Sequence, residues 1–512
     1  MGPPEKPEGE PPQPTPPTVY LIGAGPGDPG LLTLRGRECL ARADVVLHDY
    51  LAGERLLNLA RPDARLYCLG RHGAGKLWSQ QEINERMVAE ARAGACVARL
   101  KGGDPGVFGR LAEEVEALSA ANLAFEVVPG VTTAAAAGAY AGVTITNREQ
   151  ASCVAFVTGH EEPNKPDSSL DYATLARFPG TLVIYMGVTT AAHWSGELIR
   201  HGKPVATPVV LVRRCSLPDQ TTIDCTLGQV PAVLAPGLVR PPLVAIIGEV
   251  ARRSELSSWF TRRPLFGKTV LVTRPQRQAG PMVQRLRDLG ADVLLQPVIE
   301  VLPPTDWSVV DAAIDRLSEF DWVVFSSRNG VQALMDRVAE RGFDARRFGS
   351  ARLAAIGPAT AAALGDYGLS ADLHPEEYRA EALAEVLAAG ASGKRVLLLR
   401  ASRGREVLAE QLAAAGAEVE QVVVYRSVDV KAPDAQVAGA LAAGRVDWTT
   451  ATSSAIARSL VSLFGEDLRK TKLAAISPLT AGAMNECGHA AAAVAREYTA
   501  EGVVAAILRA TE

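Results

Sequence analysis

Glycine-rich loops that follow short apolar strands are the places where this sequence is most suited to bind a ligand. The first is Gly23 to Gly30, between a predicted strand over Val19 to Ile22 and a predicted helix over Leu31 to Ala41. Glycine lets a ligand approach the main chain closely. The third glycine of a dinucleotide fingerprint is replaced by Asp28, and Pro26 has no N–H for a pyrophosphate. Taken alone, the loop is also compatible with a plain turn.

Other predicted strands of the first half also end in small or polar residues, and a helix is predicted over Gln80 to Arg92. Alternating strands and helices indicate α/β architecture, in which ligands bind beyond the carboxyl ends of the strands. We therefore expect these loops to build one pocket. The loops are His48 to Tyr50, Gly70 to Gly73, Lys101 to Gly106, Pro129 to Thr133, and Met186 with Gly187.

The second half of the chain contains an internal repeat. Asp321 to Ser327 and Leu353 to Thr360 recur as Asp447 to Ser454 and Leu473 to Thr480. Two similar α/β lobes are therefore predicted. The Ser and Thr residues at the strand ends precede helices, where free N–H groups bind anions. The same hydroxyls can simply cap the helices, and the sequence leaves both roles open.

Composition limits the function classes. The chain has 512 residues, which predicts two to four domains, and a net charge of −4, which gives no basic field for nucleic acid. Its seven cysteines form no C-x-x-C pair, so we expect neither a metal site nor a disulfide framework. We expect a cytoplasmic location. No apolar run reaches membrane-spanning length. Residues 1–18 hold eight prolines and are expected to be a disordered tail.

Residues 19–262 resemble uroporphyrinogen-III C-methyltransferase, a member of the S-adenosylmethionine-dependent tetrapyrrole methylases. The resemblance implies a two-lobed tetrapyrrole methylase fold that holds the cofactor between its lobes and forms a homodimer. The matching segments keep the family's order: Gly23 to Pro29, Leu31 to Leu34, Ala43 to Asp49, Gln81 to Asn84, Arg99 to Pro105, Phe108 to Arg110, Val128 to Gly130, Ala139 to Gly142, Val157 to His160 and Tyr185 to Gly187.

The resemblance also assigns site residues in the first half. Asp49 matches a proposed proton acceptor, and Arg71 takes the place of the family's proton-donor lysine. Because a guanidinium is almost never deprotonated, carboxylate binding is expected of Arg71, and Arg148 is a second candidate for it. The turn Arg213 to Ser216 departs from the family's acidic-Asn-Gly-Thr turn. S-adenosyl-L-methionine would contact Pro26, Gly102, Gly103, Asp104, Val107, Thr132, Thr133 and Met186.

Residues 263–512 resemble uroporphyrinogen-III synthase, which needs no cofactor. The resemblance implies an α/β fold with a discontinuous first lobe, 267–300 plus 430–512, a second lobe over 304–424, and Tyr425 on the returning connector. Tyr425 would hydrogen-bond the departing hydroxyl of the substrate. The substrate is rich in carboxylates, for which we expect cationic and hydroxyl groups. These are Arg274, Ser326, Ser327, Thr360, Thr452, Ser453 and Ser454.

Together the two resemblances predict a bifunctional enzyme. Its second half would cyclise hydroxymethylbilane to uroporphyrinogen III with inversion of ring D. Its first half would methylate that product at C2 and C7 to give precorrin-2. The alternative is a later corrin-ring methyltransferase fused to a non-catalytic two-lobed binding module.

Overall fold

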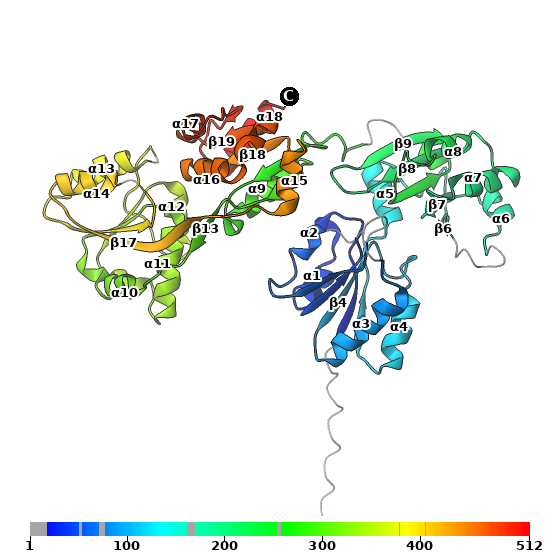
Figure 1. Cartoon of the computed structure of the whole chain (residues 1–512), viewed down its shortest axis with the longest axis horizontal. Helices are drawn as coiled ribbons and strands as arrows, with labels where there is room; N and C mark the ends of the chain where they lie inside the picture. Colours follow the sequence, from blue (N-terminus) through cyan, green and yellow to red (C-terminus); the bar gives the residue numbers. More distant parts are fainter. Residues whose placement is uncertain are drawn as a thin grey trace, which may run out of the picture. The chain divides into compact units, whose positions relative to one another are not determined.

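The computed structural model describes residues 18–50, 54–70, 77–160, 169–252, 258–377, 379–404 and 406–511. The chain divides into two compact units (Figure 1). The N-terminal unit runs to Gly267 and includes Leu289–Asp292; the C-terminal unit comprises Lys268–Asp288 and Val293–Glu512. The predicted tail lies almost entirely outside the described residues.

The first sheet of the N-terminal unit is wholly parallel and has helices on both faces. One face packs on α1 and α2 and the other on α3 and α4, through two separate apolar clusters. The strand order is β3 (Arg65–Cys68), β2 (Val45–His48), β4 (Val97–Lys101), β1 (Val19–Gly23) and β5 (Phe125–Val128). The helices are α1 (Leu34–Leu40), α2 (Glu54–Leu57), α3 (Gln80–Arg92) and α4 (Leu111–Ala120).

The second sheet of this unit is mixed, with only β6 and β7 paired in parallel. The alanine-rich α5 (Thr133–Ala141) leaves the first sheet after β5 and packs on one face of the second. Helices α6 (Tyr172–Arg177), α7 (Ala191–Arg200) and α8 (Val230–Val233) lie on the other face. The strand order is β6 (Val154–Thr158), β7 (Thr181–Tyr185), β10 (Leu243–Ile247), β8 (Pro208–Arg213) and β9 (Thr221–Thr226).

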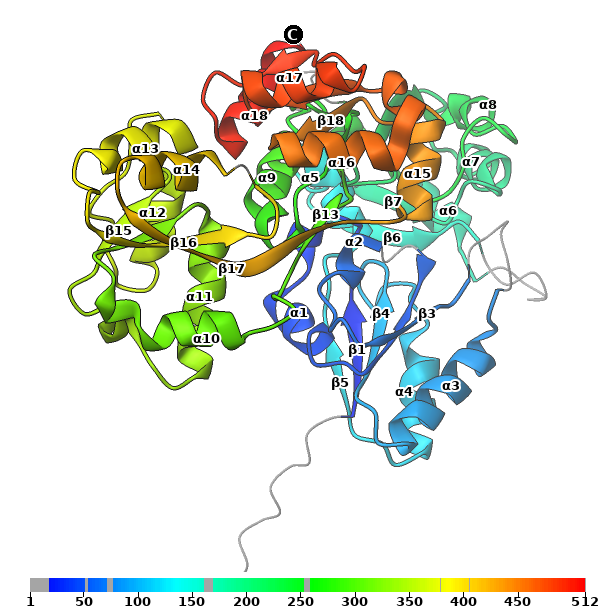
Figure 2. The same cartoon turned by 60° about the vertical axis from the view of Figure 1, so that its left-hand side comes forward.

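The C-terminal unit has one lobe assembled from both ends of its sequence (Figure 2). β11 pairs in parallel with β18, about 180 residues later in the chain. The strand order is β12 (Asp292–Leu295), β11 (Thr269–Val272), β18 (Trp448–Ala451), β19 (Lys472–Ala475) and β20 (Ala493–Val494). The helices are α9 (Gln276–Asp288), α15 (Ala435–Ala442), α16 (Ser454–Phe464), α17 (Pro478–Glu486) and α18 (Ala500–Arg509).

The second lobe is inserted between β13 and β17. β17 pairs in parallel with β16 up to Tyr425 and then antiparallel with β13 from Arg426 to Asp429. The strand order is β13 (Ile299–Leu302), β17 (Glu418–Asp429), β16 (Arg395–Ala401), β14 (Trp322–Phe325) and β15 (Arg352–Ala355). The helices are α10 (Ser308–Asp315), α11 (Arg328–Glu340), α12 (Pro358–Gly365), α13 (Ala380–Ala388) and α14 (Val407–Ala414).

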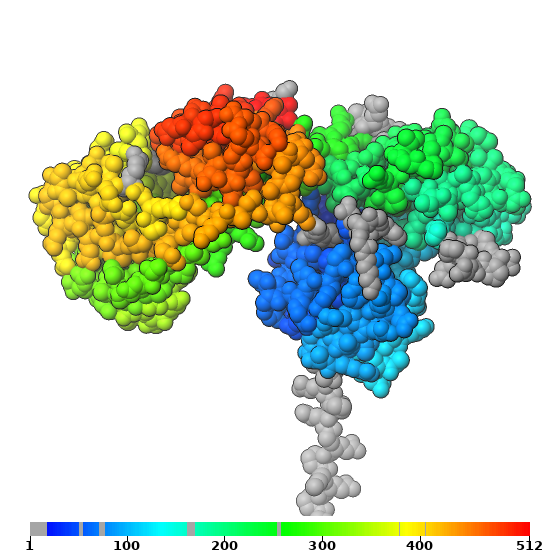
Figure 3. Space-filling model, viewed as in Figure 1, coloured from blue at the N-terminus to red at the C-terminus, as the bar shows by residue number. Residues whose placement is uncertain are grey.

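The predicted repeat is visible as β14–α11–β15–α12 and β18–α16–β19–α17. Asp321 and Asp447, just before β14 and β18, accept from the main-chain N–H groups of Arg395 and Thr269 at 2.9 and 2.8 Å. The space-filling view shows the second lobe in light green to yellow and the C-terminal part of the first lobe in orange to red (Figure 3). The α/β class, the two-lobed halves and the discontinuous lobe are confirmed.

One local prediction is wrong. The helix predicted from Leu31 begins at Leu34, because the Thr33 side chain caps it by accepting from the N–H of Gly36, and residues Pro29–Leu31 form a 3-10 turn. The helix predicted over Gln80 to Arg92 is confirmed, with a capping box between Ser79 and Glu82. No helix in the described ranges has the length and apolar character needed to cross a bilayer.

Candidate active sites

The loops at the carboxyl ends of the first sheet meet at main-chain contact. Gly25 and Gly103 exchange N–H···O hydrogen bonds of 3.1 and 2.8 Å. A Cβ on Gly23 would lie 2.5 Å from Cα of Gly130 and 2.8 Å from O of Gly103. Gly23 and Gly130 therefore stand where no side chain fits, and their contacts with each other and with Gly103 bring the loops after β1, β4 and β5 together.

Hydroxyl and carboxylate groups fix the same loops. The Asp104 carboxylate accepts from the N–H groups of Gly106 and Gly130 at 2.8 and 3.0 Å. The Tyr185 hydroxyl at the end of β7 lies 2.7 Å from Oγ1 of Thr132 and accepts from the N–H of Ala134 at 2.8 Å. Tyr185 was not among the predicted site residues, and it links the two lobes of the unit at their strand ends.

Large apolar side chains are exposed at this edge. Met186 is 49% exposed and Phe108 is 41% exposed, and the Phe108 ring packs on Tyr185 with centroids 5.1 Å apart. Both have positive φ, an uncommon conformation for residues with side chains. Val107 closes a turn on the Asp104 carbonyl at 3.2 Å. Exposed apolar side chains beside tight glycine loops provide a surface on which an apolar part of a small ligand can pack.

The loop that carries Pro26 is anchored to the second lobe by Asp28. The Tyr140 hydroxyl donates to the Asp28 carboxylate at 2.9 Å, and the N–H of Asp28 donates to Oγ of Ser216 at 3.0 Å. Burial and the adjacent Asp28 raise the pKa of Tyr140, so its hydroxyl stays a donor. Ser216, in the turn that departs from the family pattern, therefore helps to hold the loop that carries Pro26, which the sequence did not reveal.

Asp49 belongs to a network of acidic and basic side chains that the sequence did not predict. Its Oδ1 lies 2.7 Å from Nη2 of Arg99, and Nε of Arg99 lies 2.9 Å from Oε1 of Glu114. Lys101 completes the chain, with Nζ 2.6 Å from Oε2 of Glu114. Burial lowers the pKa of Arg99, but Asp49 and Glu114 outweigh it and the net shift is upward. Burial and the neighbouring Arg99 lower the pKa of Lys101.

The structure does not place either predicted carboxylate-binding arginine of the first half, Arg71 or Arg148, at the glycine loops. Arg71 lies outside the described residues. Arg148 is exposed in a turn closed by hydrogen bonds between Asn147 and Ala151, and no contact among the described residues ties it to the glycine loops. Within the described ranges, no three His, Cys, Asp or Glu side chains are grouped as a metal site.

In the C-terminal unit, groups from both lobes meet near the start of α11. Arg274 follows β11, and burial together with repulsion from Arg328 lowers its pKa. Its Nε is buried and has no hydrogen-bond partner among the described residues. Nε2 of Gln278 donates to Oδ1 of Asn329 at 2.6 Å, which joins α9 to α11. Two adjacent cations with an unused donor form a site suited to carboxylates.

Tyr425 lies beside this cluster. Its hydroxyl is 3.0 Å from Oγ of Ser327, which also accepts from the N–H of Gly330 and so caps α11. The Tyr425 side chain is nearly buried, at 8% exposure. Tyr425 thus lines a cavity while its hydroxyl is held by Ser327.

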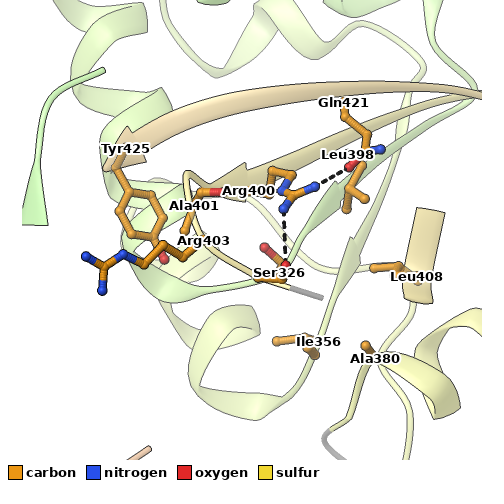
Figure 4. Close-up of a pocket in the computed structure, with 11 residues that line it drawn as sticks. Ser326, Ile356, Ala380, Leu398, Arg400, Ala401, Arg403, Leu408, Gln421 and Tyr425 are labelled. Atoms are coloured by element: carbon orange, nitrogen blue, oxygen red, sulfur yellow. Dashed lines mark hydrogen bonds between the residues drawn. The ribbon is translucent and has the colours of Figure 1, made fainter. Parts of the chain in front are cut away.

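That cavity, of about 200 Å³, lies in the second lobe (Figure 4). Arg400 is near its centre and donates to Oε1 of Gln421 at 2.7 Å (Figure 4). Arg403 lies on the Tyr425 side and forms two hydrogen bonds of 2.8 and 2.9 Å with the Asp429 carboxylate. Ser326 also lines the cavity, and its hydroxyl donates to the Leu399 carbonyl at 2.9 Å.

The remaining hydroxyl residues are divided in their surroundings. Ser453 caps α16 by accepting from the N–H of Ile456 at 3.1 Å, as Ser327 does in the other repeat. Ser454 makes a long contact of 3.4 Å with the Leu479 carbonyl, and Thr452 is half-buried at the end of β18. Thr360 is 3% exposed, so its hydroxyl faces the packing of α12 rather than solvent.

Comparisons with known proteins match each half to a family. The family model described as Tetrapyrrole (Corrin/Porphyrin) Methylases matches residues 18–231, and the one described as Uroporphyrinogen-III synthase HemD matches residues 280–505. The chain is 32% identical over 488 residues to "Porphyrin biosynthesis protein HemD" of Ruminiclostridium josui, covering 95% of both chains.

Two further similarities concern the N-terminal half. The "S-adenosyl-L-methionine-dependent uroporphyrinogen III methyltransferase" of Methanosarcina barkeri is 43% identical over 238 residues, which cover 46% of this chain and 93% of that one. A crystal structure of uroporphyrin-III C-methyl transferase from Thermus thermophilus, complexed with S-adenyl homocysteine, is 41% identical, with a TM-score of 0.40 over 46% of this chain and 98% of that one. The end-to-end match to the first relative decides the family. The chain belongs to the porphyrin biosynthesis proteins in which a tetrapyrrole methylase is joined to a uroporphyrinogen-III synthase.

Proposed function

We propose that the C-terminal unit converts hydroxymethylbilane to uroporphyrinogen III, and that the N-terminal unit methylates this product at C2 and C7 with S-adenosyl-L-methionine to give precorrin-2. The observation that carries the proposal is the order of the two sites on one chain. The cationic site near Arg274 suits the acidic open-chain tetrapyrrole, and the glycine loops suit a methyl donor. One unit would therefore make what the other consumes.

In the synthase reaction, the chain would fold the substrate and assist departure of its hydroxyl. Tyr425, hydrogen-bonded to Ser327, donates to the leaving oxygen, while Arg274 and Arg328 hold carboxylates of the substrate. Ser326 and the arginines of the cavity provide further polar groups along it. Much of the acceleration would come from placing the two ends of the substrate together.

In the methyl transfer, the sulfonium of S-adenosyl-L-methionine supplies an electrophilic methyl group when bound. Main-chain groups of the loops at Gly102 and Gly103 border the site, with Pro26, Val107, Thr132 and Thr133 around them. Met186 covers an apolar side. Asp49, partly exposed just after β2, then accepts the proton that the tetrapyrrole ring system loses once the methyl group has been transferred.

A coupled assay on the full chain tests the proposal. Hydroxymethylbilane alone is expected to give uroporphyrinogen III, and addition of S-adenosyl-L-methionine is expected to give precorrin-2, both identified by chromatography and mass spectrometry. Formation of uroporphyrinogen I alone would contradict the synthase activity. Methylation of a later corrinoid but not of uroporphyrinogen III would support the alternative enzyme.

The proposal also covers assembly and location. The chain would act in the cytoplasm, as its seven free cysteines suggest, and would dimerise through the N-terminal unit. An exposed Phe156 on the edge strand β6 and an exposed Leu66 on the edge strand β3 are apolar groups available for such an interface. Light scattering during gel filtration measures the mass directly.

A further inference from the structure

Asp49, Arg99, Glu114 and Lys101 form a network of charged side chains. All of them except Asp49 are buried. Arg99 and Lys101 are on β4 and share a face with Val97, where the apolar cluster of α3 and α4 packs. Glu114 reaches the same place from α4, one turn before the buried Leu118. Such positions normally hold apolar residues, and buried ion pairs are often replaced by them without loss of stability. Stability alone therefore does not account for these charges.

Within this network, Asp49 is the most exposed side chain. The side chain of Asp49 is 35% exposed, whereas those of Arg99, Lys101 and Glu114 are 4%, 2% and 0% exposed. Asp49 also stands at the carboxyl end of β2, where its N–H donates to the Leu100 carbonyl at 3.1 Å. The buried charged groups thus lead to Asp49, the carboxylate that accepts the proton in the proposed function.

Arg99 is the member that contacts both acids. Its Nη2 holds Oδ1 of Asp49, its Nε holds Oε1 of Glu114, and its Nη1 donates to the Leu100 carbonyl at 3.2 Å. With three donors of a rigid planar fork engaged, the guanidinium cannot swing. Lys101 balances the second negative charge by pairing with the other oxygen of Glu114. Among the described residues, Arg99 holds the Asp49 carboxylate through Oδ1, and we infer that Oδ2 serves the substrate.

We propose that Arg99, fixed by Glu114, is the positioning residue that orients the Asp49 carboxylate for proton acceptance in the methyl transfer. The inference rests on the proposed role of Asp49. It differs from a purely structural ion cluster in one respect: loss of Arg99 should matter to catalysis only while the Asp49 carboxylate is present.

A double-mutant cycle on the full chain separates the two. Arg99→Gln, Asp49→Asn and the double variant are compared for kcat and KM of methyl transfer to uroporphyrinogen III, with calorimetric binding of S-adenosyl-L-methionine. We expect Arg99→Gln to lower kcat at least about tenfold with little change in cofactor affinity, since small displacements of a reacting group are costly. In the Asp49→Asn background the same change should lower kcat less than about twofold, because the effects are coupled.

Two further variants guard the interpretation. Arg99→Lys keeps the buried positive charge but loses the fork, so a folded variant with reduced kcat is expected, and wild-type kcat would overturn the inference. Arg65→Gln removes an arginine that pairs at 2.6 Å with another buried carboxylate, Glu90, in the same lobe, and should leave kcat unchanged.

The outcomes also separate this inference from the proposed function. Multiplicative losses from Arg99→Gln and Asp49→Asn would show a structural cluster and overturn the positioning role alone. Full activity of Asp49→Asn would overturn the role of Asp49 as proton acceptor, and the inference with it. Absence of methyl transfer in the unaltered chain would overturn the proposed function itself.

Discussion

The two units treat charge at their candidate sites in opposite ways. In the N-terminal unit, Asp49 is paired with Arg99, and the buried residues behind it neutralise one another. In the C-terminal unit, Arg274 stands next to a second cation, and its buried Nε has no partner among the described residues. The charged side chains around Asp49 thus pair with one another, whereas Arg274 keeps a buried donor without a partner in the described ranges.

The difference follows from what each reaction would require. A single carboxylate that must accept a proton at one atom benefits from fixed orientation. A flexible substrate with many carboxylates benefits from cations that are not already paired, because such pairs form with the substrate instead. Substitutions in both units test this difference.

The largest effect is expected from Gly130→Ala, which breaks the close packing found in the N-terminal unit. The added Cβ would overlap the Gly103 carbonyl and lie 2.7 Å from Cα of Gly23. We expect methyl transfer to fall more than about 100-fold, because the loops would separate, while the synthase rate stays normal. Both rates are measured on the same preparation.

A matched control is Gly196→Ala in α7, where a Cβ would have no neighbour within 4 Å. It should leave both rates unchanged. If Gly130→Ala retained methyl transfer within a few-fold of the unaltered chain, direct contact among the three glycines would not be required for the cofactor site.

The next effect concerns Arg274→Gln, which tests whether this cation, whose Nε has no hydrogen-bond partner among the described residues, binds the substrate. A charge-assisted hydrogen bond contributes about 1.5–3 kcal/mol, so kcat/KM for uroporphyrinogen III formation should fall roughly 10- to 100-fold. Because burial already disfavours this cation, its removal should not lower the unfolding temperature, whereas Arg99→Gln should lower it. Calorimetry and the synthase assay measure the two quantities.

Arg346→Gln supplies the comparison, since the Arg346 side chain is 91% exposed and pairs with Asp344. Its synthase rate should be normal. Equal losses of rate and stability in Arg274→Gln would instead assign Arg274 a structural role.

A smaller loss is expected from Tyr425→Phe, which removes a hydroxyl without changing the shape of the connector. The Ser327 hydroxyl keeps its bond to the N–H of Gly330, so α11 remains capped. We expect synthase kcat to fall about tenfold, as for one lost hydrogen bond to a leaving group. Tyr367→Phe, which loses a 3.4 Å contact with Asp336 in the same lobe, should have no effect. An unchanged kcat for Tyr425→Phe would leave substrate folding as the whole of the catalysis.

The smallest effect is on stability and depends on pH. Arg403 and then Ser459 lower the pKa of Asp429 below its ordinary value of 3.8. The unfolded chain therefore binds the proton first as pH falls, so the stabilisation is complete above that ordinary value and is lost as pH falls through the lowered one. The unfolding temperature of Asp429→Asn should lie below that of the unaltered chain at neutral pH, and the gap should close in acid. A gap that persisted unchanged in strong acid would contradict this assignment.

Local signals and the repeat were readable from the sequence. Ser79 and Glu82 form a capping box, a local motif that marks the start of α3. The two copies of the repeat, around Trp322 and Trp448, predict two similar lobes. The start of α1 was misjudged because Thr33 and Asp28 both offer caps, and the chain uses Asp28 for the short turn and Thr33 for the helix.

The contacts that organise the sites were not readable, because they join distant positions. Asp28 meets Tyr140 and Ser216, which are 112 and 188 residues away. Arg99 and Lys101 did give a signal, since two charged residues occupy a strand whose other members are apolar. Their common partner, Glu114, lies on the following helix among exposed acids, and nothing local distinguishes it from them.

The long strand β17 has a mechanical consequence. Both covalent crossings between the lobes of the C-terminal unit lie in the short ribbon of β13 and β17, from Ile299–Leu302 to Arg426–Asp429. Any rotation of one lobe against the other must twist this ribbon. Tyr425 directly precedes the ribbon and is the last residue of β17 that pairs with β16. The tyrosine thus moves with the second lobe, while Arg274 moves with the first. A ligand that contacts both residues would therefore restrict rotation of the two lobes about this ribbon.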